Sequence, residues 1–331
     1  MLKYALVFSQ LVILLASCSE KLENQNTKLS NLKKLVSSIE RETLVFNKEI
    51  ELLKEHYEFL INNSDSLLPF VDRNKYQFQG GFSSNLPETD STLSTIFIST
   101  KNLDFEKAKE EVYLTNGLDS VFLNLFKKRG LIAQVYSNSS NNVSRVYPAY
   151  DVVNLVSPDV DVRDFNFYYE ADLDHNPDKG IVWIPEAYVD PAGSGWIVSL
   201  IQPVYEKNTL FAVLGIDFTI DEYIEYFLEN EEGKLLIINR KGDIVAGKSS
   251  AIEALSMPPL KNHVYRETVK MDNFRITDFN LFNSKSKEVR EMAKSILFEK
   301  NGAYTFKNEN GLQKAQAVPF EIVDWFLLEL N

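Results

Sequence analysis

Two aspartates in the C-terminal two thirds of the chain could bind a positively charged group. Asp217 ends an otherwise apolar run over residues 211–216, where a charged side chain is costly unless it has a partner. Tyr188 and Asp190 lie two residues apart at an expected strand end, so their side chains face the same side. If Asp190 and Asp217 converge, they repel each other by about 4 kcal/mol at 4 Å and an effective dielectric constant of 20. An ammonium group between them would remove that repulsion and gain charge-assisted hydrogen bonds.

Aromatic residues lie close to both aspartates in the sequence and could enclose such a cation with their π faces. The candidates are Phe167, Tyr168, Trp183 and Tyr188. A purely structural interpretation is also open, in which Asp217 caps a turn or a helix and Asp190 belongs to an Asp-Pro turn. The residue pattern alone favours this structural interpretation.

An ordered set of short motifs supports a ligand pocket. Between residues 161 and 221 the chain contains Trp183, Tyr188-x-Asp190, Gly193-x-Gly195, Pro203-Val204 and Gly215-x-Asp217. The order and spacing of this set resemble the double Cache family of extracytoplasmic sensors. In that family a long helix precedes two α/β modules, and the membrane-distal module holds the ligand. The resemblance implies that Asp190 and Asp217 match positions that hold the ligand amino group in amino-acid-binding members.

The sequence departs from those amino-acid sensors where they bind the ligand carboxylate. They carry an Arg two residues before a Trp-Tyr pair, and alignment of Phe167-Tyr168 on that pair puts Phe165 in its place. Arg163 matches an earlier Arg of the family pattern that is usually structural, and Val160 replaces a usual Tyr. Phe cannot supply the planar fork that binds a carboxylate in a bidentate manner. The pattern therefore favours a small amine over an amino acid, although a pocket used for another small molecule is an alternative.

The N-terminus resembles a bacterial lipoprotein signal peptide. Lys3 precedes an apolar run over residues 4–16, and Leu15-Ala16-Ser17-Cys18 follows the pattern of a lipobox. A basic start, a short apolar run and small residues before a cleavage site are typical of secretion signals. The resemblance implies cleavage before Cys18, the single cysteine of the chain, and a lipid anchor on it. We expect an exported cell-envelope protein, in the periplasm or outer membrane of a diderm or on the cell surface otherwise, without a transmembrane helix.

Residues 29–60 show the spacing of a long amphipathic helix. Apolar residues recur every three or four positions, and only Thr43 interrupts the series. Asn62 and the polar residues after it predict the end of the helix, and Pro69 follows. The apolar stripe can pack on the chain's own core, or it can pair with a second copy of the chain or with a partner receptor. Both interpretations can hold along different stretches.

The rest of the chain predicts two sheet-containing modules. A strand is expected at 94–99 and helical turns at 106–128. Further strands are expected at 132–136, 180–184, 196–203 and 210–218, with polar turn clusters at 137–142 and 190–195. A helix at 220–228 precedes a second strand set at 234–239, 244–246, 302–306, 313–319 and 325–330, with a helix at 285–299. The expected fold is α+β, with two PAS-like Cache modules, each an antiparallel sheet flanked by helices. The expected boundaries are 1–17 for the signal peptide, 18–65 for the lipidated N-terminus and long helix, 66–222 for the membrane-distal module with the pocket, and 223–331 for the membrane-proximal module.

Composition and missing motifs narrow the function. The net charge of −12 and the absence of a basic cluster argue against nucleic-acid binding. No metal-binding, nucleophile-elbow, P-loop or dinucleotide motif occurs, so no metal, cofactor or catalytic residue is predicted. The chain also ends after the second module without a kinase, cyclase or methyl-accepting segment. We therefore expect a binding sensor that signals through a partner and is not an enzyme. The alternatives are an interaction lipoprotein with a vestigial pocket, or a hydrolase that uses the acidic site.

Overall fold

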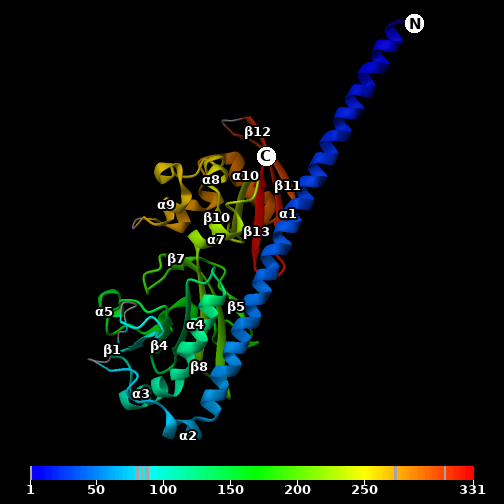
Figure 1. The fold of residues 1–331 in the computed structure, drawn as a ribbon. Coiled ribbons are helices and arrows are strands. Elements are labelled where there is room, and N and C mark those ends of the chain that lie inside the picture. Colours follow the sequence, from blue (N-terminus) through cyan, green and yellow to red (C-terminus); the bar gives the residue numbers. More distant parts are fainter. Residues whose placement is uncertain (1, 79–81, 84, 86–88, 272–273, 309–310) are drawn as a thin grey trace.

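The structure is a computed structural model that describes residues 2–78, 82–83, 85, 89–271, 274–308 and 311–331, with side chains described from residue 27 onward apart from residues 82, 83 and 308. One long helix, α1 (Leu2–Asn62), runs along two modules that each combine a sheet with helices (Figure 1). The module drawn in cyan and green lies at the C-terminal end of α1, and we call it the distal module. The yellow and red module lies beside the middle of α1, and we call it the proximal module.

Helix α1 ends at Asn62, where the polar residues predict it to end. Its apolar stripe is buried against the chain's own sheets. The buried residues of the stripe are Leu32, Val36, Ile39, Phe46, Ile50, Leu53, Tyr57 and Leu60. Thr43 is also buried, because its hydroxyl donates a hydrogen bond of 3.0 Å to the carbonyl of Ile39 one turn earlier. A partner that pairs with α1 over this stretch would have to use the opposite face, where Leu44, Leu52 and Phe59 are exposed. Pairing through the helix stays a prediction.

The distal module is built on an antiparallel sheet. Its strands are β1 (Phe82–Ser83), β2 (Thr95–Ile98), β3 (Gln134–Ser139), β4 (Val143–Tyr147), β5 (Val182–Trp183), β6 (Tyr188–Val189), β7 (Trp196–Glu206) and β8 (Thr209–Thr219). They lie in the order β1-β2-β4-β3-β8-β7-β5, and β6 also pairs with β7. The helices of the module are α2 (Ser64–Leu67), α3 (Phe105–Leu114), α4 (Leu118–Lys128), α5 (Val152–Leu155) and α6 (Asn166–Tyr169). Helix α4 contacts β3 and β4, and α3 contacts β2 and β4.

The proximal module repeats this plan with a smaller antiparallel sheet. Its strands are β9 (Lys234–Asn239), β10 (Ile244–Gly247), β11 (Ala303–Asn308), β12 (Gly311–Pro319) and β13 (Trp325–Leu330), in the order β10-β9-β13-β12-β11. Its helices are α7 (Ile220–Phe227), α8 (Ser249–Glu253), α9 (Tyr265–Val269) and α10 (Lys287–Leu297). Helix α1 contacts β12 and β13 of this sheet as well as β7 and β8 of the distal sheet. A long N-terminal helix followed by two such modules confirms the α+β fold class predicted from the sequence.

The two long strands β7 and β8 bury both of their faces. Val198, Leu200, Leu214 and Ile216 belong to the core that includes α1. Residues at the alternate positions of these strands, such as Val213, point to the opposite side of the distal sheet and belong to a separate apolar cluster. Because side chains alternate along a strand, one face of the sheet packs on α1 while the other is covered by the segment between β4 and β6.

Aromatic residues join the two modules and α1. The indole of Trp183 on β5 stacks on Phe218 at 5.4 Å between ring centroids and donates a hydrogen bond of 2.9 Å to Asn47 of α1. The indole of Trp325 on β13 donates a hydrogen bond of 3.2 Å to the carbonyl of Pro185, just after β5. The segment between β5 and β6 is therefore attached to the proximal module.

One predicted turn is shorter in the structure. The sequence predicts a turn over residues 137–142, but β3 continues through Ser139 and the turn occupies only residues 140–142. Polar residues fit this strand because they find partners within the sheet: the Ser144 hydroxyl on β4 donates to the side-chain oxygen of Asn138 at 2.6 Å. Polar composition therefore marks a strand that faces a polar site, and not a loop.

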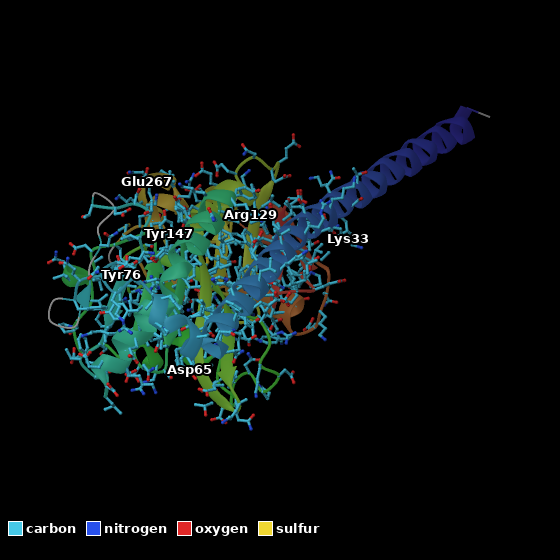
Figure 2. All side chains as sticks on the ribbon, turned by 60° about the horizontal axis from the view of Figure 1, so that its bottom comes forward. Lys33, Asp65, Tyr76, Arg129, Tyr147 and Glu267 are labelled. Carbon is cyan, nitrogen blue, oxygen red and sulfur yellow. The ribbon has the colours of Figure 1, made fainter. Side chains whose placement is uncertain are left out.

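The far N-terminal part of α1 extends past both modules, and Figure 2 labels Lys33 near the point where the helix leaves them. The side chains of residues 1–17 and of Cys18 lie outside the described part of the chain, so the signal peptide and the lipid anchor stay predictions. Within the described residues, none of the helices combines the length and apolar character of a membrane span.

Candidate functional site

A small, partly open cavity lies on the face of the distal sheet that points away from α1. Its floor is made by side chains of four adjacent strands: Phe97, Ser144, Val146, Gln134, Tyr136 and Asp217. Its cover comes from the segment between β4 and β7 and includes Val162, Phe165, Phe167, Tyr188, Asp190 and Ala192. The cavity volume is about 60 Å³. A cavity needs at least about 10–15 Å³ of such space to hold one water, so this one suits a small ligand.

Asp190 lines the cavity and also organises the turn that follows β6. Its two carboxylate oxygens accept hydrogen bonds of 2.9 Å from the backbone N–H groups of Ala192 and Ser194. The amide of Gln134 on β3 donates a third, of 2.7 Å. Asp190 therefore belongs to an Asp-Pro turn, as the structural interpretation predicts, and that turn presents its carboxylate to the cavity.

Asp217 is 2% exposed and lines the same cavity. The Ser199 hydroxyl, directly opposite on β7, donates a hydrogen bond of 2.6 Å to one carboxylate oxygen. The Tyr188 hydroxyl lies 2.6 Å from that of Ser199. Since Ser199 donates its hydroxyl proton to Asp217, Tyr188 donates the second hydrogen bond and Ser199 accepts it. Burial raises the pKa of Asp217 well above its usual value, and the nearby charge of Asp190 raises the pKa further. The two aspartates therefore act on each other within one pocket, as the sequence predicts.

Tyr136 occupies the floor between these groups because Gly215 leaves room for it. The two residues are direct partners across β3 and β8. A Cβ atom at position 215 would lie 1.9 Å from the ring carbon that carries the Tyr136 hydroxyl, so only glycine allows this ring position. The ring is 4% exposed, and burial and the Asp217 charge raise its pKa. Its hydroxyl lies within reach of Asp217, Tyr188 and Ser199, but it forms no hydrogen bond of good geometry with any group in the described part of the chain.

The cavity is acidic and aromatic. Asp190 and Asp217 are the charged residues of its lining, which contains no Lys, Arg or His. Phe165 stands where the amino-acid sensors carry their carboxylate-binding Arg, and it stacks on Phe167 at 5.1 Å between ring centroids. Phe167 in turn contacts the ring of Tyr188 at 6.4 Å. The site can therefore surround a small cation but has no group that would attract a ligand carboxylate.

Three residues predicted for the site lie elsewhere. The Arg163 guanidinium faces away and binds both oxygens of Asp161, at 2.8 and 2.6 Å. Tyr168 is buried beside the cavity without lining it. Trp183 points to the α1 side of the sheet, because it pairs with Leu200 of β7, whose side chain faces that core. Trp183 could contact a cation in the cavity only if β5 presented its other face to the cavity.

The sequence interpretation missed Gln134, Tyr136 and Ser199. The sequence signal that could have found the first two is the two-residue period of a strand. Gln134, Tyr136 and Asn138 occupy every second position of β3, so their side chains share one face of the sheet. Ser199 interrupts an apolar strand, as Asp217 does on the neighbouring strand. A polar residue repeated at every second position of a buried strand indicates a site. Among the described residues, no group of three or more His, Cys, Asp or Glu side chains is arranged to hold a metal ion.

Comparison with known proteins gives matches among solved structures. No protein-family model matches the chain, and none of the curated proteins does. One match is the ligand-binding domain of the Pseudomonas aeruginosa PAO1 amino acid chemoreceptor PctB in complex with L-Gln, with 14% identity and a TM-score of 0.41 over 61% of this chain and 68% of that one. Another is the ligand-binding domain of the Campylobacter jejuni chemoreceptor Tlp3 in complex with L-norvaline, with 13% identity and a TM-score of 0.45 over 92% and 91%. A third is the ligand-binding domain of the Pseudomonas fluorescens chemoreceptor CtaA in complex with L-serine, with 12% identity and a TM-score of 0.43 over 90% and 97%. All three are ligand-binding domains of chemoreceptors.

Proposed function

We propose that this chain is an exported, lipid-anchored sensor that binds a small amine in the distal module and passes the bound state to a partner protein. One observation carries the ligand assignment: a small cavity is lined by two carboxylates and several aromatic rings, with no cationic side chain among the described residues of its lining. An ammonium group can interact favourably with the carboxylates and with the aromatic rings, because carboxylates and aromatic faces each attract a cation.

The same lining disfavours an amino acid. The carboxylate of an amino acid would enter an acidic cavity in which Phe165 replaces the expected guanidinium. A buried anion without a partner is strongly destabilised. The cavity volume of about 60 Å³ further favours a small ligand.

The pKa of Asp217 is raised because its carboxyl is buried beside Asp190 in a pocket without a cationic side chain in its described lining. Burial and Asp190 both oppose ionisation of Asp217 when the cavity holds no cation. A bound ammonium group would lower that pKa again, because an opposite charge favours the ionised form. Ligand binding would then be coupled to release of a proton over the pH range in which the unliganded carboxyl is protonated.

Transfer of the bound state has a direct route in the chain. Tyr188 and Asp190 belong to the segment whose earlier residue Pro185 accepts a hydrogen bond from Trp325 of the proximal module. Glu186 of this segment also forms an ion pair with Lys241 in the turn between β9 and β10. Closure of the pocket wall on a ligand would pull on both contacts. A partner that binds the two arrangements with different affinity would read the change.

The position of Cys18 in α1 fits this arrangement. The N-terminal end of α1 lies on the side of the proximal module, and the distal module lies at the other end (Figure 1). A lipid on Cys18 would place the proximal module toward the membrane and the pocket away from it. Metabolic labelling with a fatty acid tests the anchor: the wild-type chain should carry the label, and Cys18→Ser should lose it. A labelled Cys18→Ser chain would refute the anchor.

Calorimetric titration tests the ligand assignment. We expect the purified chain to bind a small primary amine such as n-propylamine, and not glycine, L-serine or acetate. Asp217→Asn keeps the shape of the side chain and an acceptor for Ser199 but removes the charge, so it should abolish amine binding. Asp178→Asn, which changes an exposed aspartate outside the cavity, is the matched control and should bind as wild type. Binding of the amino acids without the amine, or equal binding by Asp217→Asn, would refute the assignment.

A further inference from the structure

We propose that the Tyr136 hydroxyl is a third hydrogen-bond acceptor for the ligand, and that it makes the pocket selective for a primary ammonium over a fully methylated one. This inference rests on the proposed amine-binding function. It starts from a buried polar group without a partner: the ring is 4% exposed, and its hydroxyl makes no hydrogen bond with the described residues. Buried polar groups are almost always paired, so an exception needs an explanation.

The hydroxyl is held in place by rigid parts of the fold. The ring of Tyr136 crosses Gly215 on the neighbouring strand, and the edge of the ring contacts Phe167 at 5.8 Å between centroids. The hydroxyl lies on the cavity floor close to Asp217 and Tyr188. The hydroxyl is therefore held at the cavity floor, where a ligand group can form the well-aligned hydrogen bond that it lacks.

The acceptors of the pocket match the donors of a primary ammonium. Asp217 accepts one hydrogen bond, from Ser199, and Asp190 accepts three. Each carboxylate has about four acceptor sites, so both keep capacity for a ligand. The Tyr188 proton is directed to Ser199, which leaves Tyr136 as the unpaired hydroxyl. Asp190, Asp217 and Tyr136 thus offer three acceptors, and an –NH₃⁺ group carries three donors. A quaternary ammonium carries none, so it would give the two carboxylates no further hydrogen bond and would leave the Tyr136 hydroxyl unpaired.

Two ligands of the same shape test this selectivity. tert-Butylammonium and tetramethylammonium each have five non-hydrogen atoms, four of them around a central tetrahedral atom. In calorimetric titration, wild type should bind tert-butylamine at least about tenfold more tightly than tetramethylammonium. Tyr136→Phe removes only the hydroxyl. It should weaken tert-butylamine binding by about tenfold to a hundredfold, as expected for a hydrogen bond to a charged group, and change tetramethylammonium binding by less than about twofold.

The unliganded protein gives an independent readout. Because the hydroxyl is unpaired without ligand, Tyr136→Phe should raise the melting temperature, by about 2 °C or more. Tyr205→Phe is the matched control, since that hydroxyl donates to the Ala171 carbonyl at 2.9 Å. It should lower the melting temperature and leave the selectivity between the two ligands unchanged.

The outcomes separate the inference from the function. Equal binding of both ligands by wild type, an equal loss for both in Tyr136→Phe, or a lowered melting temperature in Tyr136→Phe would overturn the role of the hydroxyl while amine binding stands. A wild-type chain that binds neither ligand nor n-propylamine would overturn the proposed function, and this inference with it.

Discussion

Substitution of Gly215 by alanine should damage both stability and binding through a single contact. The added Cβ would lie 1.9 Å from the Tyr136 ring carbon and 2.3 Å from its hydroxyl oxygen, whereas ordinary contacts between such atoms are about 3.5–4.0 Å. The ring must therefore move by about 1.5 Å or more. Overpacking of this kind costs about 1–3 kcal/mol. At about 2–4 °C per kcal/mol for a domain of 150–250 residues, the melting temperature should fall by about 2–12 °C.

The assay combines thermal unfolding with amine titration, and a second glycine serves as control. Gly180 has no atom within 4 Å of its would-be Cβ, so Gly180→Ala should leave stability and affinity nearly unchanged. Tyr136→Leu shortens the side chain that collides, so the double variant Gly215→Ala/Tyr136→Leu should be less destabilised than the sum of the single variants. Wild-type stability in Gly215→Ala, or strict additivity in the double variant, would refute the contact as its cause.

Further predictions concern charge and the junction between the modules. The folded-state pKa of Asp217 is raised, so the contribution of Asp217 to stability is complete below its unfolded pKa and is lost as pH rises through the folded pKa. The stability of the unliganded chain should therefore decline with pH over that window, and Asp217→Asn should flatten the decline. Amine affinity should fall as pH drops through the same pKa, and calorimetry in buffers of different ionisation enthalpy should show release of a proton on binding; pH-independent affinity would argue against this titration. Asp119 is 1% exposed and pairs with Arg145 at 2.5 Å, so Asp119→Ala should cost about 3–5 kcal/mol in denaturant unfolding. Lys54→Ala, at an exposed ion pair with Glu58, should cost less than about 0.5 kcal/mol; similar losses in the two variants would contradict the role of burial. Trp325→Ala removes a side chain that is 1% exposed and should cost about 3–5 kcal/mol. The same substitution should lower the amide-exchange protection of residues around Pro185 in the distal module. Unchanged protection there would show that the Trp325 contact does not stabilise this part of the distal module.

The sequence predicts most elements because each has a clear period. The stripe of α1 repeats every three or four residues and is buried along its length from Leu32 to Leu60. The strands at 234–239 and 325–330 coincide with β9 and β13. These segments pack against apolar partners, so hydrophobic spacing describes them fully.

The errors arise where the sequence lacks information on register. The face on which Trp183 lies is set by its pairing with Leu200, and a two-residue strand has no period that could reveal this. Gln134 and Ser199 become site residues only because β3, β8 and β7 align them beside Asp217. Pairing between distant strands depends on the whole sheet, which local patterns do not determine. Asp217 itself was predictable as an unusual residue, because a charged side chain in a buried strand is rare without a partner.

The two-faced packing of β7 and β8 limits how this protein can evolve. A substitution on either strand alters one side only, and the other side can remain intact. A one-residue insertion or deletion before Asp217 would instead exchange the two faces, and it would send the carboxylate into the core against α1 while Phe218 entered the cavity. Length variation among descendants of this gene should therefore collect in the turn at residues 207–208 and in the segment that covers the pocket. Between Trp196 and Thr219, the strand lengths themselves should stay constant even as the ligand changes.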